Sequence, residues 1–235
     1  MVRVSCVIYD LDGLLLDTEP FYTRASQVIA RRFGRDFDWA LKARMMGRDA
    51  SEAARTFVEA LELPLTPEAY LEERRALLEA WFPGARPMPG ARRLTRHLHR
   101  YGIPQAVATS SERRLFELKI RRHRKWFRLF ACCVTGDEPE VGHAKPAPDI
   151  FLVAARRLGA EPERCLVFED SPAGVQAALA AGMYVVAVPD PRVERSALRG
   201  AHQVLAGLGE FDPAAWGLPP YRRTARAAAG AQAEE

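Results

Sequence analysis

The sequence predicts an α/β fold, a Rossmann-like doubly wound parallel sheet with an α-helical domain inserted near its start. From residue 86 onward, short apolar runs alternate with helical patterns, as in parallel sheets built from strand–helix units. Residues 4–9 form a similar apolar run, rich in β-branched side chains, which indicates a first strand buried on both faces. Residues 18–82 contain helical patterns and no strand pattern. The insert therefore interrupts the α/β unit just after its first strand.

Apolar spacing and helix-breaking residues place the individual elements. In the insert, the predicted helices are 20–33, 39–46, 51–61 and 68–82. A stretch rich in proline and glycine marks the return to the sheet. After it, the predicted helices are 91–101, 111–125, 148–158 and 172–181, and the predicted strands are 104–109, 130–135, 165–168 and 184–188.

These elements define the predicted domains. The α/β core comprises residues 1–17 and 86–221, and the helical cap comprises residues 18–85. The last stretch, 222–235, is rich in Ala, Arg and Gln and has no hydrophobic period, so we expect a disordered tail.

Composition sets the expectations for compartment and partners. The formal net charge of +4 is mildly basic and by itself identifies no partner. The cysteines lack C-x-x-C spacing, so we expect no zinc site and interpret them as small buried hydrophobes in a reducing compartment; they are Cys6, Cys132, Cys133 and Cys165. Asp10 interrupts the N-terminal apolar run, and no stretch of eighteen apolar residues exists. We therefore expect a cytoplasmic protein without a signal peptide or a membrane partner. We also expect it to be a monomer.

Two acids mark the end of the first strand. Asp10 and Asp12 follow the apolar run directly, and Gly13 comes next. Open α/β sheets place their active sites at the carboxyl ends of the strands. Two close carboxylates repel unless a cation compensates, and their oxygens suit magnesium. The alternative is a strand followed by a solvated turn.

Three later motifs also fall at predicted strand ends or in loops beside them. Thr109 and Ser110 precede a helix, where hydroxyls and free backbone N–H groups bind phosphate well; Ser111 alone is explained by a plain N-cap. Lys145 could neutralise a phosphate, although a lone loop lysine is usually solvated. Glu169 and Asp170 end another apolar strand, and with the first two acids they complete an oxygen-rich magnesium pocket.

Together these motifs resemble the four ordered motifs of the haloacid dehalogenase superfamily. Residues 10–18 match its first motif, Asp-x-Asp-Gly-x-Leu-x-Asp-(Ser/Thr), and the resemblance covers residues 2 to about 190. The insert resembles the superfamily's small helical cap. The Glu-Asp-Ser-Pro-x-Gly sequence from Glu169 resembles that of the β-phosphoglucomutase-like branch. Within this branch the chain most resembles the pseudouridine-5′-phosphatases, and that similarity extends to Tyr221.

The resemblance implies a magnesium-dependent phosphomonoester hydrolase that acts through an aspartyl-phosphate. It makes Asp10 the nucleophile and Asp12 the acid and base. The implied magnesium ligands are Asp10, the Asp12 carbonyl and Asp170, with Glu169 assisting, and the phosphoryl group is held by Thr109, Ser110 and Lys145. The implied partner is a small phosphorylated metabolite, pseudouridine 5′-monophosphate in the first place, with the cap contacts Glu19, Tyr22, Gly47 and Arg48.

Departures from the family pattern and rival functions remain open at this point. Ala144 replaces the usual glycine before the motif lysine, and Tyr9 stands where phenylalanine is usual. A sugar-phosphate phosphatase of the 2-deoxyglucose-6-phosphatase kind has the same motifs. A mutase of this branch uses a cap histidine, but the first histidine here is His97, beyond the cap.

A non-enzymatic nucleic-acid binder would use the basic and aromatic segment 121–128. We favour a helix end there, with Phe127 and Phe130 in the core and the basic side chains placed favourably by the helix dipole. We therefore expect no nucleic-acid partner.

Overall fold

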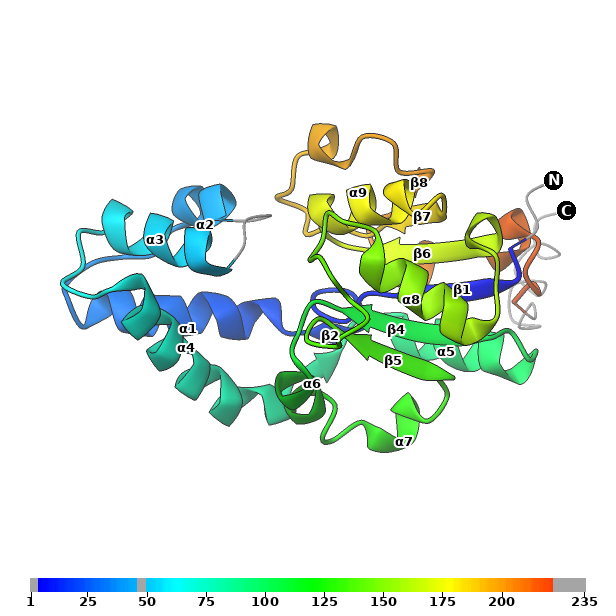
Figure 1. Cartoon of the computed structure of the whole chain (residues 1–235), viewed down its shortest axis with the longest axis horizontal. Helices are drawn as coiled ribbons and strands as arrows, with labels where there is room; N and C mark the ends of the chain where they lie inside the picture. Colours follow the sequence, from blue (N-terminus) through cyan, green and yellow to red (C-terminus); the bar gives the residue numbers. More distant parts are fainter. Residues whose placement is uncertain (1–3, 46–49, 222–235) are drawn as a thin grey trace, which may run out of the picture.

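The computed structural model describes residues 4–45 and 50–221, which form an α/β core and a helical cap beside it (Figure 1). The core contains a sheet in the order β5-β4-β1-β6-β7-β8, and each neighbouring pair of strands is parallel. This confirms the predicted doubly wound sheet. Its strands are β1 (Cys6–Tyr9), β4 (Gln105–Thr109), β5 (Cys132–Thr135), β6 (Cys165–Glu169), β7 (Tyr184–Ala187) and β8 (Gln203–Val204).

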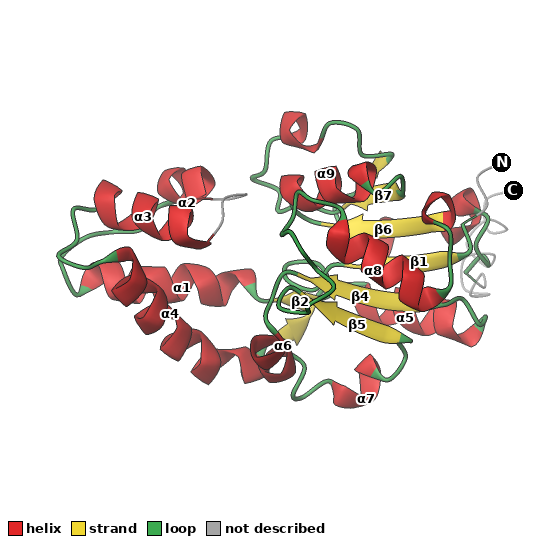
Figure 2. Cartoon of the chain, in the orientation of Figure 1, coloured by secondary structure: helices red, strands yellow, loops and turns green. Residues whose placement is uncertain are grey.

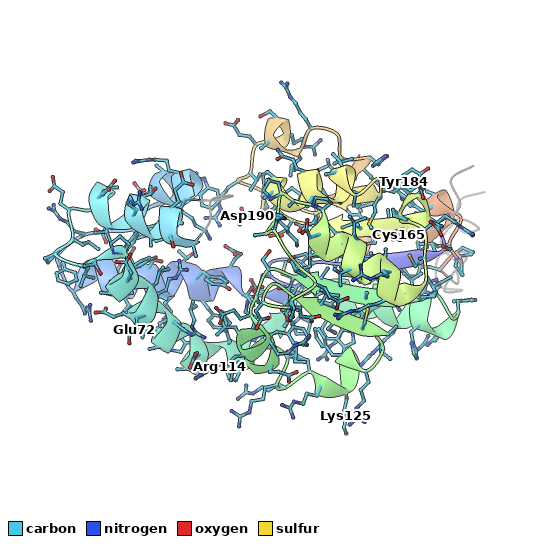
Figure 3. All side chains as sticks on the ribbon, viewed as in Figure 1. Glu72, Arg114, Lys125, Cys165, Tyr184 and Asp190 are labelled. Carbon is cyan, nitrogen blue, oxygen red and sulfur yellow. The ribbon has the colours of Figure 1, made fainter. Side chains whose placement is uncertain are left out.

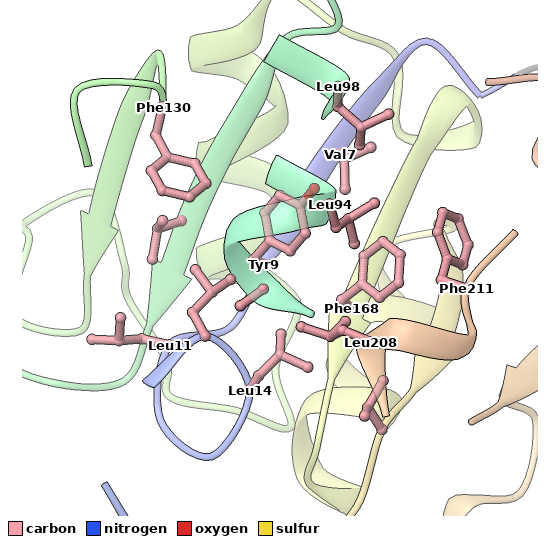
Figure 4. Packing of buried hydrophobic residues seen from close by; sticks show 14 of the residues in the cluster. Val7, Tyr9, Leu11, Leu14, Leu94, Leu98, Phe130, Phe168, Leu208 and Phe211 are labelled. Carbon is pink, nitrogen blue, oxygen red and sulfur yellow. The ribbon is translucent and has the colours of Figure 1, made fainter. Parts of the chain in front are cut away.

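Alternate residues of the central strand β1 face opposite sides of the sheet, as the pleat of a strand requires. Val7 and Tyr9 lie in an apolar cluster on one side (Figure 4), and Ile8 lies in a second cluster on the other. The Tyr9 ring stacks on Phe168 with centroids 5.3 Å apart. Its buried hydroxyl donates to Oε1 of Gln105 at 2.9 Å, so no polar group is left unpaired there.

Helices cover both faces of the sheet (Figure 2). Leu94 and Leu98 of α5 and Phe116 of α6 pack in the first cluster. Phe151 and Val175, from α8 and α9, pack in the second. The core helices are α5 (Ala91–Arg100), α6 (Arg113–Lys119), α7 (Arg124–Phe127), α8 (Asp149–Leu158) and α9 (Pro172–Ala180), and the 3₁₀ turns are Phe82–Gly84, Pro162–Arg164, Arg195–Leu198, Leu208–Glu210 and Pro213–Trp216.

The cap has a small core of its own. Phe57 stacks on Tyr70 with ring centroids 4.2 Å apart, and Phe37 meets Phe57 edge-on. The Tyr70 hydroxyl is paired with that of Ser26 at 2.7 Å. Its helices are α1 (Glu19–Arg31), α2 (Trp39–Met45), α3 (Ala50–Ala60) and α4 (Pro67–Trp81).

A two-stranded antiparallel ribbon connects cap and core. The chain leaves through β2 (Leu16–Asp17) and returns through β3 (Arg86–Pro87), with Leu16 opposite Pro87. The Met88 N–H also donates to the Leu15 carbonyl at 2.9 Å. The ribbon lies beside the boundaries predicted for the cap, and residues 222–235, where we expect a tail, lie outside the described residues.

The structure corrects three sequence interpretations. The single helix predicted over 111–125 is wrong, because the chain turns between α6 and α7. In that turn His123 Nε2 contacts the Ala85 carbonyl at 2.8 Å, and Trp126 and Phe127 then reach the core. Cys132 and Cys133 are only partly buried, because they lie on the edge strand β5. The short strands β2, β3 and β8 were not predicted, since two residues carry no recognisable pattern.

The aromatic residues of the basic segment lie inside the protein. Phe127 and Phe130 are buried, which confirms their interpretation as core residues. Arg124, beside them, pairs with Glu117 on the surface. In the part of the chain that the structure describes, no helix combines the length and the apolar character needed to cross a bilayer.

Candidate active site

The predicted acids meet where the sheet reverses its order. From β1 the chain proceeds to β4 on one side, and from the neighbouring β6 it proceeds to β7 on the other. Ligands of open α/β folds bind at such a switch point, outside the carboxyl ends of the strands. A cavity of about 620 Å³ lies there, between core and cap. Its lining includes the predicted residues Asp10, Asp12, Thr109, Ser110, Lys145, Asp170, Glu19 and Tyr22.

Lys145 joins two of the predicted acids. Its ammonium lies 2.5 Å from Oδ1 of Asp10 and 2.7 Å from Oε1 of Glu169. Burial is the main cause that raises the pKa of Asp10 to about 7. The charge of Lys145 lowers this pKa, whereas the carboxylates of Glu169 and Asp12 raise it further. The sequence left open whether Lys145 is solvated or functional. Its side chain is buried and contacts Asp10, the candidate nucleophile, whose ionised form it stabilises.

Glu169 lies behind the cavity wall. Its Oε2 accepts from the backbone N–H groups of Asp170 and Ser171 at 2.8 and 2.9 Å. Gly174 makes this possible, because a Cβ there would lie 1.7 Å from Glu169 Oε1. With both oxygens engaged, Glu169 holds Lys145 and the start of α9 in place, and a direct bond from it to a metal stays a prediction.

Asp170 points across to the loop after β1. Gly13 has a φ of +76°, and a Cβ on it would lie 2.4 Å from Asp170 Oδ2. Burial and the neighbouring carboxylates of Glu169 and Asp10 raise the pKa of Asp170 well above its usual range. Only a residue without a side chain lets the two acidic loops approach this closely.

The donor set fits magnesium. Asp10, Glu169 and Asp170 bring three carboxylates to the single ammonium of Lys145, an imbalance that a divalent cation would relieve. No group of three or more His, Cys, Asp or Glu side chains in the described ranges has metal-binding geometry of its own. Magnesium needs few protein ligands because it keeps several waters, so two carboxylates and a backbone carbonyl suffice.

Asp12 is held by a second set of donors. Thr18 Oγ1 donates to its Oδ1 at 2.6 Å and Ser111 Oγ to its Oδ2 at 2.9 Å. The Lys119 ammonium bridges both oxygens at 2.6 and 2.8 Å. Burial alone would raise the pKa of Asp12, but Lys119 and the hydroxyl donors outweigh it and lower that pKa.

Sequence reasoning missed Lys119 and misjudged Ser111. Ser111 is no N-cap, because α6 begins two residues later and its hydroxyl contacts Asp12. The available signal for Lys119 was its position on the apolar face of the helix, three residues after Phe116 and next to Ile120. Thr109, fully buried, lies 3.4 Å from Asp12 Oδ2 through its hydroxyl, and Ser110 is exposed at the wall of the cavity.

The cap supplies polar and aromatic groups to the opposite wall. Glu19 Oε2 pairs with Lys42 at 2.8 Å, and Arg74 lies over the Tyr22 ring at 5.9 Å. The predicted contacts Gly47 and Arg48 lie outside the described residues. The cavity therefore has polar and aromatic side chains on its cap wall and carboxylates on its core wall.

One further contact crosses from core to cap at the rim. Asp190 lies on the side of the core that faces the cap (Figure 3) and accepts two bonds from Arg192. The Arg192 guanidinium covers the Trp39 ring of α2 at 4.0 Å. Trp39 and Asp190 both line the cavity, so this contact lies at its edge.

The family model of haloacid dehalogenase-like hydrolases matches residues 4–182. The chain belongs to this family. It is 51% identical over 223 residues to (DL)-glycerol-3-phosphatase 2 of Arabidopsis thaliana, covering 93% of both chains. It is 47% identical over 222 residues to the "probable pseudouridine-5′-phosphatase" of Drosophila melanogaster, covering 93% of this chain and 96% of that one. These similarities confirm the predicted phosphatase.

The fold is shared with solved members of the family. A haloacid dehalogenase family hydrolase from Deinococcus radiodurans, with phosphate and sodium bound, superposes with a TM-score of 0.77 at 27% identity. The match covers 94% of this chain and all of that one. The predicted α/β core with its helical cap is thus the fold of the family.

Proposed function

We propose that this phosphatase is magnesium-dependent and hydrolyses its substrate through an aspartyl-phosphate on Asp10. The observation that carries the proposal is the arrangement of Asp10 between Lys145 and Asp170 in one cavity at the switch point of the sheet. Asp10, Asp170 and the Asp12 carbonyl would hold magnesium. When bound, the ion would neutralise the phosphoryl oxygens during the displacement.

Two displacements at phosphorus complete the reaction. In the first, an Asp10 oxygen bonds to phosphorus while the bond to the alcohol oxygen breaks, and Asp12 gives that oxygen its proton. The negative charge of the bound phosphate would let Asp12 hold this proton, because a neighbouring anion raises the pKa that Lys119 lowers in the free site. In the second, water bonds to phosphorus and passes a proton to Asp12, and the Asp10 carboxylate leaves. Asp12 is then protonated again for the next cycle. A carboxylate nucleophile divides one difficult step into two easier ones.

The remaining core groups hold the phosphoryl oxygens. Lys145 lies next to the nucleophile. Thr109 ends β4 and Ser110 follows it, and both line the cavity. Fixed donors of this kind stabilise developing charge without having to reorganise. Hydrolysis is favoured over a mutase reaction because the sequence places no histidine in the cap.

For the substrate we propose pseudouridine 5′-monophosphate, acted on as a small metabolite by a cytoplasmic monomer. A cavity of about 620 Å³ is in the size range that encloses whole small molecules, with space for a base and a ribose. Lys42 fixes Glu19 at the cavity wall, where its carboxylate can accept from a ring N–H. Pseudouridine offers one more ring N–H than uridine, and buried polar groups discriminate strongly against analogues that leave them unpaired.

Glycerol 3-phosphate is the second candidate. It is favoured by the 51% identity to the Arabidopsis glycerol-3-phosphatase, which exceeds the 47% to the Drosophila protein. A three-carbon alcohol would contact fewer of the cap side chains than a nucleoside does.

Parallel kinetics separate these substrates. We would measure kcat/KM for pseudouridine 5′-monophosphate, uridine 5′-monophosphate, glycerol 3-phosphate and 2-deoxyglucose 6-phosphate at one magnesium concentration. We expect pseudouridine monophosphate to exceed uridine monophosphate by about tenfold or more. Glu19→Ala should reduce this ratio, whereas Glu73→Ala, which removes a cap carboxylate paired with Arg32 outside the cavity, should leave it unchanged. A clear preference for glycerol 3-phosphate or the hexose phosphate would refute the nucleotide assignment and leave the mechanism intact.

A further inference from the structure

Lys119 is a fully buried lysine that the mechanism above does not use. It lies at the end of α6, and its three ammonium protons meet three partners. Besides Asp12, they contact Ser111 Oγ at 2.6 Å and the Tyr22 hydroxyl at 3.0 Å. A buried ammonium is costly unless it is fully paired, and this one is.

The ammonium lies behind the reacting groups. Asp12, Ser111 and Tyr22 all line the cavity, whereas the Lys119 side chain has no exposed surface. A direct contact to the phosphoryl group is therefore blocked by the residues that Lys119 holds. Any effect of Lys119 on the reaction has to pass through them.

Two of its contacts belong to the base of the cap. Tyr22 is part of α1, and the rings of Phe82 and Tyr22 lie 4.5 and 5.3 Å from the ammonium. Asp12 and Ser111 belong to the core. One ammonium thus joins the proton-transferring carboxylate to the segments through which the cap meets the core.

We propose that Lys119 is a positioning residue that orients Asp12 for proton transfer and ties its orientation to the cap through Tyr22. This inference rests on the proposed function, in which Asp12 exchanges the proton. Orientation matters because small displacements of a catalytic group cost large factors in rate. The position of the cap would thereby influence proton transfer by Asp12, although no residue of the cap touches the reacting atoms.

The test separates proton transfer from phosphate binding by the leaving group. Single-turnover rates with enzyme in excess isolate the first displacement. The substrates are p-nitrophenyl phosphate, whose leaving group needs no proton, and the alkyl phosphate with the highest kcat/KM in the substrate comparison. We expect Lys119→Met to lower the single-turnover rate of the alkyl phosphate by about thirtyfold or more, which is part of the full effect of a general acid. The rate with p-nitrophenyl phosphate should fall by less than about threefold.

A double-mutant cycle keeps the test valid if Lys119→Met is unstable. Asp12→Asn with Lys119→Met removes both charges together, so it leaves no unpaired buried ion. If Lys119 acts through Asp12, its replacement should cost almost nothing more in the Asp12→Asn background. Tyr22→Phe should lower the alkyl rate in the same direction by a smaller factor, with little change in KM.

The contrary outcomes are distinct. Equal losses for both substrates, or a full additional loss in the Asp12→Asn background, would refute the role of Lys119. A change confined to KM in Tyr22→Phe would refute the connection to the cap. A wild-type protein that hydrolyses neither substrate in magnesium buffer would instead overturn the proposed function, and this inference with it.

Discussion

Replacing Gly13 with alanine should damage the proposed metal site from outside its ligand set. Gly13 has a φ of +76°, and its added Cβ would lie 2.4 Å from Asp170 Oδ2. Two penalties follow. A left-handed backbone costs an L-residue about 1–2 kcal/mol, and the Asp170 oxygen must also retreat by about 1 Å to reach ordinary van der Waals contact.

Gly102→Ala is a matched control. Its φ of +70° carries the same backbone penalty, but its Cβ would meet nothing within 4 Å. Urea unfolding should show both variants destabilised by about 1–2 kcal/mol, with Gly13→Ala at least as unstable as the control. A magnesium titration of activity should separate them, because magnesium tolerates little distortion of its ligands. We expect the half-saturating magnesium concentration to rise about 10- to 100-fold in Gly13→Ala and to stay unchanged in Gly102→Ala. Equal magnesium requirements in the two variants would refute the reasoning.

Three further outcomes test the same site. Asp10→Asn should lower kcat by at least about a thousandfold with an unchanged circular dichroism spectrum, and activity within tenfold of wild type would exclude Asp10 as the nucleophile. Excess chelator should abolish turnover, added magnesium should restore it, and Asp170→Asn should need more of the ion; full activity in chelator would contradict the metal site. Without metal, the free energy of unfolding should fall as pH rises from about 4 to above 7. The pKa of Asp10 is raised from 3.8 to about 7 in the fold. Protonated Asp10 therefore stabilises the fold fully below pH 3.8, and this contribution is lost as the pH rises through about 7. Urea titrations across this range should show a flatter dependence in Asp10→Asn, and the prediction fails if the slope is the same.

The strands and the acids of the core were predictable because each is a local pattern. Residues 4–9 and 165–168 are apolar runs that end directly in carboxylates, and an open α/β sheet gathers such strand ends at one edge. The order of the motifs along the chain then sufficed to place them together. No contact between distant side chains was needed for that inference.

The partners of Asp12 were not predictable in this way. Lys119 is 107 residues distant in sequence, and helix periodicity alone cannot distinguish a buried lysine from one whose stem covers the core and whose charge reaches water. Ser111 was misjudged for a similar reason, since its position before a helix suits a cap. The pairing of Glu19 with Lys42 depends on how α1 and α2 pack, which the sequence does not specify residue by residue.

Because the chain enters and leaves the cap through the paired strands β2 and β3, the cap can be replaced as one unit. Leu16 and Pro87 are direct partners across this pair of strands, so the two ends of the cap lie about one strand spacing apart, roughly 5 Å. A tight turn could span that gap in place of some seventy residues, and another insert could occupy it without disturbing the sheet. Under the proposed function, changes in the cap would alter which alcohol is accepted, while the carboxylates that act on phosphorus stay in the core.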